Sequence, residues 1–267
     1  MKKYLSIATL LAAGTLFVNA ASVIPPELNN DNLLFHWDFS TGADPAKKPN
    51  NVTLNNSFQY NEAGYGTCTG SNGVWSTNVS QSGLNANSFT VSFDVFGFQA
   101  NNWCNLLSIY TNNVTSGDNN CLAVQKSGGD DVKLYIGNIG GNNSYFGGAT
   151  SGADATIGSY ATLFGTDWTT LTFSSNGSVF KVYSNGQLLK TVNLATTNTN
   201  ITGFQFGAAF GNGRQSTSAN FDNIAIWNTA LTDEQVASLV PEPSAFGLLA
   251  GLGVLALVGA RRRRKTK

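Results

Sequence analysis

Residues 167–192 read DWTTLTFSSNGSVFKVYSNGQLLKTV and contain the clearest hairpin signal in the chain. At its centre is Asn185-Gly186, a pair that tolerates the positive φ angles of a two-residue type I′ turn, so the stretch predicts a β-hairpin. In the simple register of that hairpin Lys181 faces Lys190, and like charges directly opposite each other repel. We therefore expect a solvated face there, with a basic spot for an anionic glycan as the alternative.

Two upstream stretches alternate with a period of two. In LLFHWDF at 33–39 and FTVSFDVF at 89–96, every second residue is large and apolar, and most of the residues between them are polar. Alternation of this kind places apolar side chains on one face of a strand. No long segment with the 3.6-residue period of a helix appears before the end of the chain. The pattern predicts half-buried strands of a β-sandwich.

Residues 221–240 read FDNIAIWNTALTDEQVASLV and change from a strand pattern to a helical one. Thr232 and Gln235 have the spacing of a capping box, and Leu231 can pack on Val236 as a hydrophobic staple. We expect a short helix here that closes one end of the sandwich.

In order along the chain, LLFHWDF, FTVSFDVF, the hairpin stretch and FDNIAIWNTALTDEQVASL resemble laminin-G-like, concanavalin A-like jelly-roll domains. The resemblance runs from Leu33 to Val240, and its last two motifs are the more specific. It implies an all-β fold, a two-sheet antiparallel jelly-roll sandwich over residues 32–240. It says little about the ligand, because function depends on sites built onto a fold.

The N-terminus has the three parts of a secretory signal. Lys2 and Lys3 precede an apolar run, and small residues follow, with an expected cleavage after Ala20. We therefore expect a signal peptide at 1–20 and a linker at 21–31. A membrane anchor that is never cut is the alternative, and it gives the same topology.

The C-terminal tail, residues 241–267, combines three features. Pro241, Glu242 and Pro243 come first, residues 245–260 are all apolar or Gly, and Arg261, Arg262, Arg263 and Arg264 follow. At about 1.5 Å per residue the apolar run is about 24 Å long, marginally enough for a transmembrane helix, which we expect at 244–260. Basic flanks stay on the cytoplasmic side, so the body is expected outside.

This tail resembles the PEP-CTERM sorting signal of exported bacterial proteins. The resemblance implies an exosortase-type membrane processing enzyme as a partner. It also implies secretion through the inner membrane as a membrane-anchored precursor, and delivery to the cell surface or extracellular matrix. The alternative is an ordinary single-pass tail, which would keep the protein in the membrane permanently.

Charge is sparse and unevenly placed. Only 11% of residues are charged, and from residue 21 to 242 seven basic residues stand against all fifteen acidic ones, a net charge of −8. Nucleic-acid binding needs a basic surface that displaces counterions from phosphates, so we expect no nucleic-acid partner. Cys68, Cys104 and Cys121 permit one disulfide and leave one thiol, and their spacing does not choose the pair.

The sequence offers no familiar catalytic constellation. Glycoside hydrolases on this fold carry Glu-x-Asp-x-x-Glu, which puts carboxylates on one strand face, and no such triplet occurs here. The single histidine, His36, alternates with core residues in the first strand, and its pairing with Asp38 on the polar face is expected to be surface decoration. One histidine and three scattered cysteines cannot form a zinc site. We therefore name no catalytic residue and expect a non-enzymatic protein.

Two kinds of binding site are open. Related jelly rolls hold calcium with Asp carboxylates, so calcium is a candidate cofactor, with candidate ligands Asp118, Asp130, Asp131 and Asp222. For Asp222, hydrogen bonding in a turn or sheet is the alternative. A sugar site needs an exposed aromatic ring beside polar groups, and Trp103 and Tyr145 lie in Asn- and Gly-rich stretches. Rings folded back over the sandwich edge are the alternative for both.

These observations favour an exported cell-surface or matrix protein whose jelly-roll domain binds carbohydrate or matrix without catalysis. The expected partner outside the cell is an exopolysaccharide or another glycan. One alternative is a structural component of the exopolysaccharide matrix without a discrete ligand site. A glycan-active hydrolase is the less favoured alternative.

Overall fold

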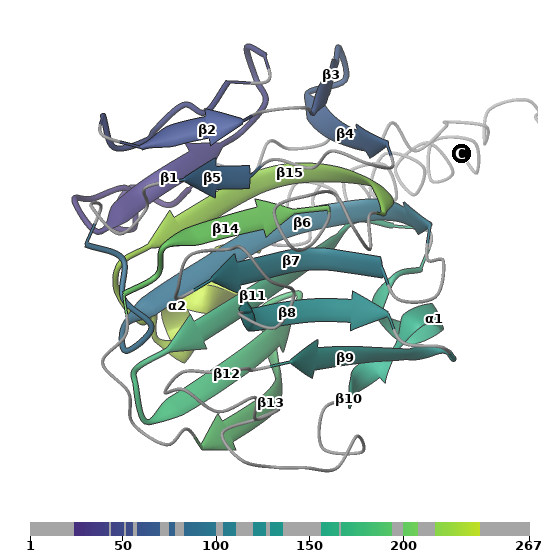
Figure 1. Ribbon diagram of the computed structural model, residues 1–267. Coiled ribbons are helices and arrows are strands. Elements are labelled where there is room, and N and C mark those ends of the chain that lie inside the picture. Colours follow the sequence, from purple (N-terminus) through teal and green to yellow (C-terminus); the bar gives the residue numbers. More distant parts are fainter. Residues whose placement is uncertain are drawn as a thin grey trace, which may run out of the picture.

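The computed structural model describes residues 24–42, 44–50, 52–55, 58–69, 75–77, 83–99, 104–110, 120–126, 129–135, 156–165, 167–193, 200–207 and 217–240. Within these ranges the chain forms fifteen strands and two short helices, α1 (Tyr160–Leu163) and α2 (Asp233–Ser238). Every strand pairing among them is antiparallel, and the strands form two sheets packed face to face (Figure 1). The predicted all-β antiparallel sandwich is confirmed.

The larger sheet has eight strands. Their order is β13 (Gln187–Asn193), β12 (Val179–Ser184), β11 (Thr169–Ser175), β6 (Phe89–Gln99), β15 (Ser218–Trp227), β4 (Tyr65–Thr69) and β3 (Gln59–Asn61), with β1 (Leu33–Trp37) also pairing with β15. The smaller sheet has seven strands. Their order is β10 (Thr156–Ser159), β9 (Asp131–Tyr135), β8 (Asn120–Lys126), β7 (Cys104–Tyr110), β14 (Gly203–Phe206), β5 (Trp75–Thr77) and β2 (Thr53–Asn55).

The core lies between the inner faces of the two sheets and is rich in phenylalanine. Phe93 of β6 meets Phe206 of β14 edge-on with ring centroids 5.5 Å apart, and Phe35 of β1 meets Phe204 at 5.0 Å. Such edge-to-face contacts between fully buried rings add to the energy of burying their area. The inner faces are therefore filled with side chains, and a ligand site must use an outer face, an edge or a loop.

The predicted hairpin joins β12 to β13, with Asn185 at φ 49° and Gly186 at φ 73°. The simple register is wrong, however. Tyr183 pairs with Leu188 but Val182 pairs with Lys190, so Leu189 is the extra residue of a bulge. Lys181 consequently faces Thr191, and the expected repulsion between two lysines does not arise. The Lys181 ammonium instead lies 2.6 Å from a carboxylate oxygen of Asp233 in α2.

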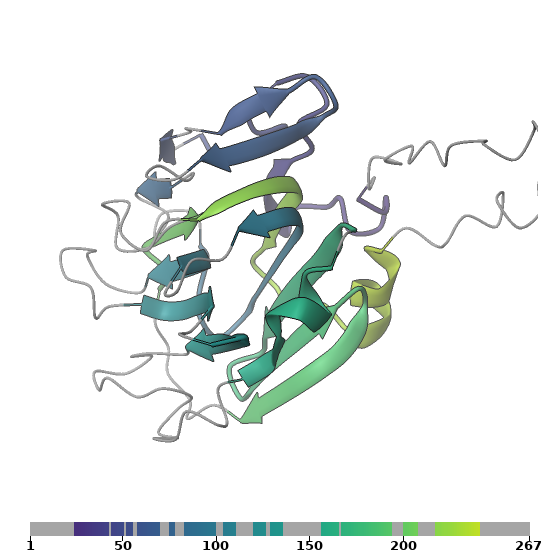
Figure 2. The ribbon, with the colours of Figure 1, turned by 90° about the vertical axis from the view of Figure 1, so that its right-hand side faces the viewer.

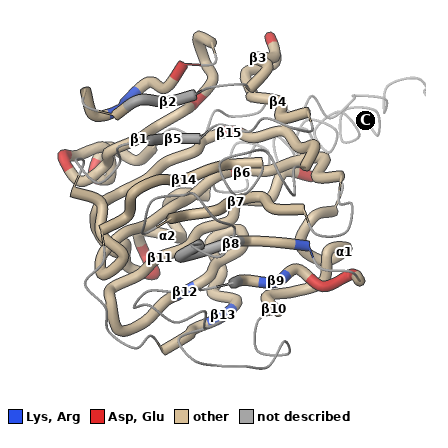
Figure 3. The backbone as a smooth tube through the Cα atoms, viewed as in Figure 1, with Lys and Arg blue, Asp and Glu red and all other residues tan. Residues whose placement is uncertain are grey.

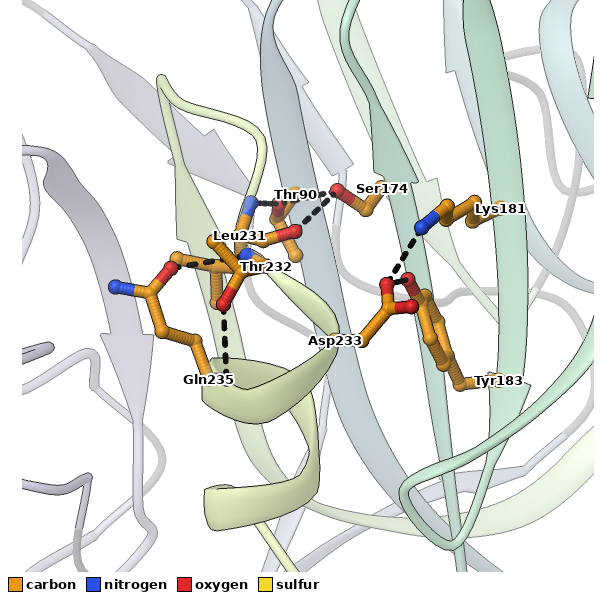
Figure 4. A network of polar contacts seen from close by, with 8 residues as sticks. All are labelled: Thr90, Ser174, Lys181, Tyr183, Leu231, Thr232, Asp233 and Gln235. Carbon is orange, nitrogen blue, oxygen red and sulfur yellow. Dashed lines mark hydrogen bonds and ion pairs between the residues drawn. The ribbon is translucent and has the colours of Figure 1, made fainter.

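Helix α2 begins with the predicted capping box (Figure 4). The backbone N–H of Gln235 donates to Thr232 Oγ1 at 3.3 Å, and the backbone N–H of Thr232 donates to Gln235 Oε1 at 2.9 Å. Leu231 and Val236 are buried in one cluster, as the staple predicts. The expected position at one end of the sandwich is wrong. The same cluster contains Ala225 and Trp227, which point away from the main core, so α2 covers the outer face of the eight-stranded sheet (Figure 2).

The segment before β1, which we expected to be a linker, is packed from residue 24 onward. Ile24 and Leu28 are buried in the same cluster as Leu231 and Val236. The Trp227 indole N–H donates to the Leu28 carbonyl at 2.9 Å. The expected signal peptide at 1–20 and the tail at 241–267 lie outside the described residues. Within the described ranges, neither helix is long and apolar enough to cross a membrane.

Candidate functional site

The outer face of the eight-stranded sheet divides into a covered half and a half that no other described segment covers, which we call the open half. Helix α2 and residues 24–31 pack over Trp227 and Tyr183. At the opposite end of β6 and β15, the side chains of Tyr65, Phe96 and Trp168 are only half-buried. This open half is the candidate site.

Strand register aligns the residues of the open half in two rows. In the first row Thr67 of β4 faces Asn220 of β15, which faces Phe96 of β6. Thr169 of β11 faces Val95, so the preceding residue, Trp168, falls beside Phe96. The second row contains Thr170, Asp94 and Asp222, which are successive partners on β11, β6 and β15.

Three rings from distant parts of the chain meet on this face. The Trp168 ring lies 5.5 Å from the Phe96 ring and 5.7 Å from the Tyr65 ring, measured between centroids. Strands β11 and β4 are separated by β6 and β15, about 14 Å at roughly 4.8 Å per strand, so the rings of Trp168 and Tyr65 must lean across the sheet to touch. We call Tyr65, Phe96 and Trp168 the aromatic patch.

Neutral polar groups border the aromatic patch. The Asn61 side-chain amide donates to the Tyr65 hydroxyl at 3.0 Å, and the Thr67 hydroxyl donates to Asn220 Oδ1 at 2.9 Å. Asn185 of the hairpin turn accepts a bond from the Thr170 backbone N–H at 2.9 Å and is itself exposed. A half-exposed ring surface edged by amides and hydroxyls can stack on a sugar ring and bond its hydroxyls.

A pair of carboxylates lies in the second row. Asp94 Oδ1 accepts from the Thr170 hydroxyl at 2.5 Å, and Asp94 Oδ2 accepts from the Asn223 side-chain amide at 2.6 Å. Asp222 accepts from the backbone N–H of Asn223 at 2.8 Å. Asn223 has φ 49°, and it lies in a bulge where the β15–β6 register shifts. The bulge therefore holds Asp222 and Asp94 side by side, and we call them the carboxylate pair.

Burial raises the pKa of both members of the carboxylate pair. The Asp222 side chain, with only 5% of the residue exposed, has its pKa raised to about 7, mainly by burial and further by the charges of Asp94 and Asp38, against the opposing bond from Asn223. Burial also raises the pKa of Asp94, and the bonds from Thr170 and Asn223 oppose that shift. Near neutral pH the pair is therefore only partly ionised.

A glycosidase needs two nearby carboxyl groups, one with a raised pKa as general acid and the other ionised, and sequence reasoning found no candidate pair. Here, however, both oxygens of Asp94 accept hydrogen bonds from neighbouring strands, and Asp222 is almost inaccessible. The pair is placed to hold the bulge together.

Most of the site residues predicted from sequence lie outside the part of the chain that the structure describes. Trp103, Tyr145, Asp118 and the sorting residues Pro241, Glu242, Pro243, Arg261, Arg262, Arg263 and Arg264 lie outside the described residues. Asp130 and Asp131 are exposed at the start of β9, in the other sheet from Asp222. In the ranges that the structure describes, no three His, Cys, Asp or Glu side chains are grouped to hold a metal ion.

His36 does not behave as surface decoration. It faces Ala225 on the outer side of β15, and its Nε2 atom is buried with no hydrogen-bond partner within the described residues. Burial lowers the pKa of its imidazole, the nearby Asp38 carboxylate opposes that shift, and Lys47 adds to it. The imidazole is therefore neutral at physiological pH.

Sequence reasoning missed the aromatic patch. Phe96 carried a signal, because it follows Thr90, Ser92 and Asp94 on the side of β6 that should be polar. Tyr65 and Trp168 carried none, since neither lies in an alternating run long enough to reveal its face.

Comparison with known proteins gives two family matches. Residues 69–237 match the concanavalin A-like lectin/glucanases superfamily, and residues 239–264 match the PEP-CTERM protein-sorting motif. No curated protein matches the chain. The sorting motif supports an exported protein that is processed at a membrane.

Solved structures share the fold at low identity. Trypanosoma rangeli sialidase is 15% identical with a TM-score of 0.58, over 81% of this chain and 33% of the sialidase chain. The botulinum neurotoxin serotype G binding domain is 14% identical with a TM-score of 0.53, over 78% of this chain and 50% of that chain. The chain thus spans a third to a half of the structures that it matches. On the evidence of its sandwich and of the family match over most of its length, the chain belongs to the concanavalin A-like lectin/glucanases superfamily.

Proposed function

We propose that this protein is an exported surface or matrix protein whose domain binds carbohydrate without catalysis. The observation that carries the proposal is the aromatic patch, three touching rings on an open sheet face edged by neutral amides and hydroxyls. Aromatic faces beside a few polar groups are the usual chemistry of sugar recognition. The lectin-like fold is compatible with this role and does not by itself specify it.

The burial and the hydrogen bonding of the carboxylate pair favour sugar binding over hydrolysis. A general acid must reach the glycosidic oxygen, and a nucleophile must reach the sugar carbon. Asp222 is 5% exposed, and both Asp94 oxygens already accept hydrogen bonds. We therefore propose that the domain is not an enzyme.

The sorting motif supports the proposed location. An exosortase-type enzyme would process the tail at residues 239–264, and the domain would reach the cell surface or extracellular matrix. A transmembrane helix at 244–260 would hold the precursor before processing. The proposed extracellular partner is an exopolysaccharide.

Pull-down on insoluble polysaccharides tests the function. Full-length protein in mild detergent is expected to be retained by at least one polymer, and Trp168→Ala is expected to lower retention at least tenfold. Tyr60→Ala is the matched control, because Tyr60 is 42% exposed but faces Gly66 in the β3–β4 pair and so lies on the other side of that pair from Tyr65. Retention by no polymer, or equal losses in both variants, would contradict the proposal.

A further inference from the structure

We infer that the aromatic patch selects neutral polysaccharides and rejects polymers of uronic acids. This inference rests on the proposed function and adds the chemical class of the ligand. It follows from the charges placed around the three rings.

The described strands under the patch carry two carboxyl groups, which are partly ionised near neutral pH, and no lysine or arginine. Strands β4, β15, β6 and β11 contain no Lys or Arg, and they contain Asp94 and Asp222. Asp38 follows β1 directly and is close enough to Asp222 to raise its pKa. A polymer stacked on Trp168 and Tyr65 would therefore lie over or beside these carboxylates, because the two rings lean across β6 and β15 to meet.

The described lysines are the blue segments in Figure 3, and none of them belongs to β4, β15, β6 or β11. On the outer face of the same sheet, Lys47 pairs with His36 of β1, and its ammonium donates to the Asn30 carbonyl at 2.9 Å. The other lysine there is Lys181, which faces Ser174, six residues along β11 from Trp168. That separation is about 20 Å at roughly 3.4 Å per residue. Lys181 is also already paired with Asp233. On the described strands under the patch, β4, β15, β6 and β11, an anionic sugar would find no cation to offset the acidic charge.

Neutral sugar rings suit the patch because they can both stack on its rings and form hydrogen bonds with the amides around it. A pyranose ring presents C–H bonds that stack on an aromatic face, and its hydroxyls can bond the Asn220, Asn61 and Asn185 amides around the patch. A carboxylate on the sugar would add repulsion that weakens with salt. We expect at least tenfold weaker binding for a uronate polymer than for the preferred neutral polymer at low salt.

Affinity electrophoresis of the full-length protein tests the inference. Gels would contain neutral laminarin, dextran or galactomannan, or anionic alginate, polygalacturonate or hyaluronan. Retardation is expected in at least one neutral gel and not in the uronate gels. Trp168→Ala should abolish it, Trp168→Phe should restore part of it, and Tyr60→Ala should leave it unchanged. Thermal unfolding of each variant shows whether its fold is intact.

The carboxylate pair has its own test. Asp94→Asn together with Asp222→Asn should reduce the preference for neutral over anionic polymers at low salt. Tighter binding of uronate polymers by the natural protein, or neutral binding that survives Trp168→Ala, overturns the inference but leaves carbohydrate binding intact. Retardation in none of the gels overturns the proposed function as well.

Discussion

Replacing Asp222 by asparagine should change how the stability of the domain depends on pH. The ordinary pKa of an aspartate is near 3.8, and in the folded protein burial raises that of Asp222 to about 7. A carboxyl with a raised folded pKa binds its proton more tightly in the native state, so unfolding releases the proton at intermediate pH. The stabilisation that protonated Asp222 gives the folded state is therefore fully present below about pH 4, declines as the pH rises to about 7 and is lost above pH 7.

The magnitude follows from the rise in the pKa of Asp222. Each pKa unit corresponds to about 1.4 kcal/mol, so a rise from 3.8 to about 7 is worth about 4 kcal/mol between pH 4 and pH 7.5. The side-chain amide of the Asp222→Asn variant would keep an acceptor for the backbone N–H of Asn223 and would carry no charge beside Asp94. The variant should therefore equal the natural protein at pH 4 and exceed it by up to about 4 kcal/mol at pH 7.5.

Urea unfolding in detergent, followed by tryptophan fluorescence from pH 4 to pH 8, measures the free energy of unfolding of the full-length natural protein and of the full-length Asp222→Asn variant. The difference between variant and natural protein cancels the titrations that the two share. A difference that is flat over this range would refute the reasoning. So would one that rises as the pH falls.

Three further predictions concern the packing of the domain. Thr232→Ala removes the hydroxyl that accepts a hydrogen bond from the backbone N–H of Gln235 in the α2 capping box, and it should lower the free energy of unfolding by about 1 kcal/mol, measured by urea titration. Gly66→Ala should lower the free energy of unfolding by about 1–3 kcal/mol, because the new Cβ would lie 2.5 Å from a ring carbon of the buried Phe39. The control Gly129→Ala, whose Cβ would meet open space, should lower it by less than about 0.5 kcal/mol in the same urea titration. Equal losses in the two variants would contradict this explanation. Burial raises the pKa of the Cys68 thiol to about 11, so iodoacetamide at pH 8 should leave Cys68 unlabelled in the native protein and label it in urea, as peptide mass spectrometry would show.

Local features of this fold could be predicted from sequence, and pairings between strands could not. Asn185-Gly186 determines its own turn, and Thr232 with Gln235 determines its own cap, because each depends on a few neighbouring residues. The bulge at Leu189 could not be seen, since the alternating pattern of the hairpin fits either register. The contact of Lys181 with Asp233 joins residues more than fifty positions apart.

The candidate site was hidden for a related reason. Tyr65, Phe96 and Trp168 meet only because β4, β15, β6 and β11 are neighbours in that order. The same order makes Asp94 the partner of Asp222, although 128 positions separate them in the chain. Only Phe96 broke a local pattern, and one irregular aromatic residue does not identify its partners.

The attachment of α2 has a mechanical consequence for a domain held by its tail. Leu231 is bonded through its N–H to Thr90 on β6 and through its carbonyl to Ser174 on β11, while Asp233 is bonded to Lys181 and Tyr183 on β12 (Figure 4). Drag on a tethered domain would enter it from residue 240 through this helix. The load would be spread over three adjacent inner strands at once, and the edge strand β13 would not be peeled away first.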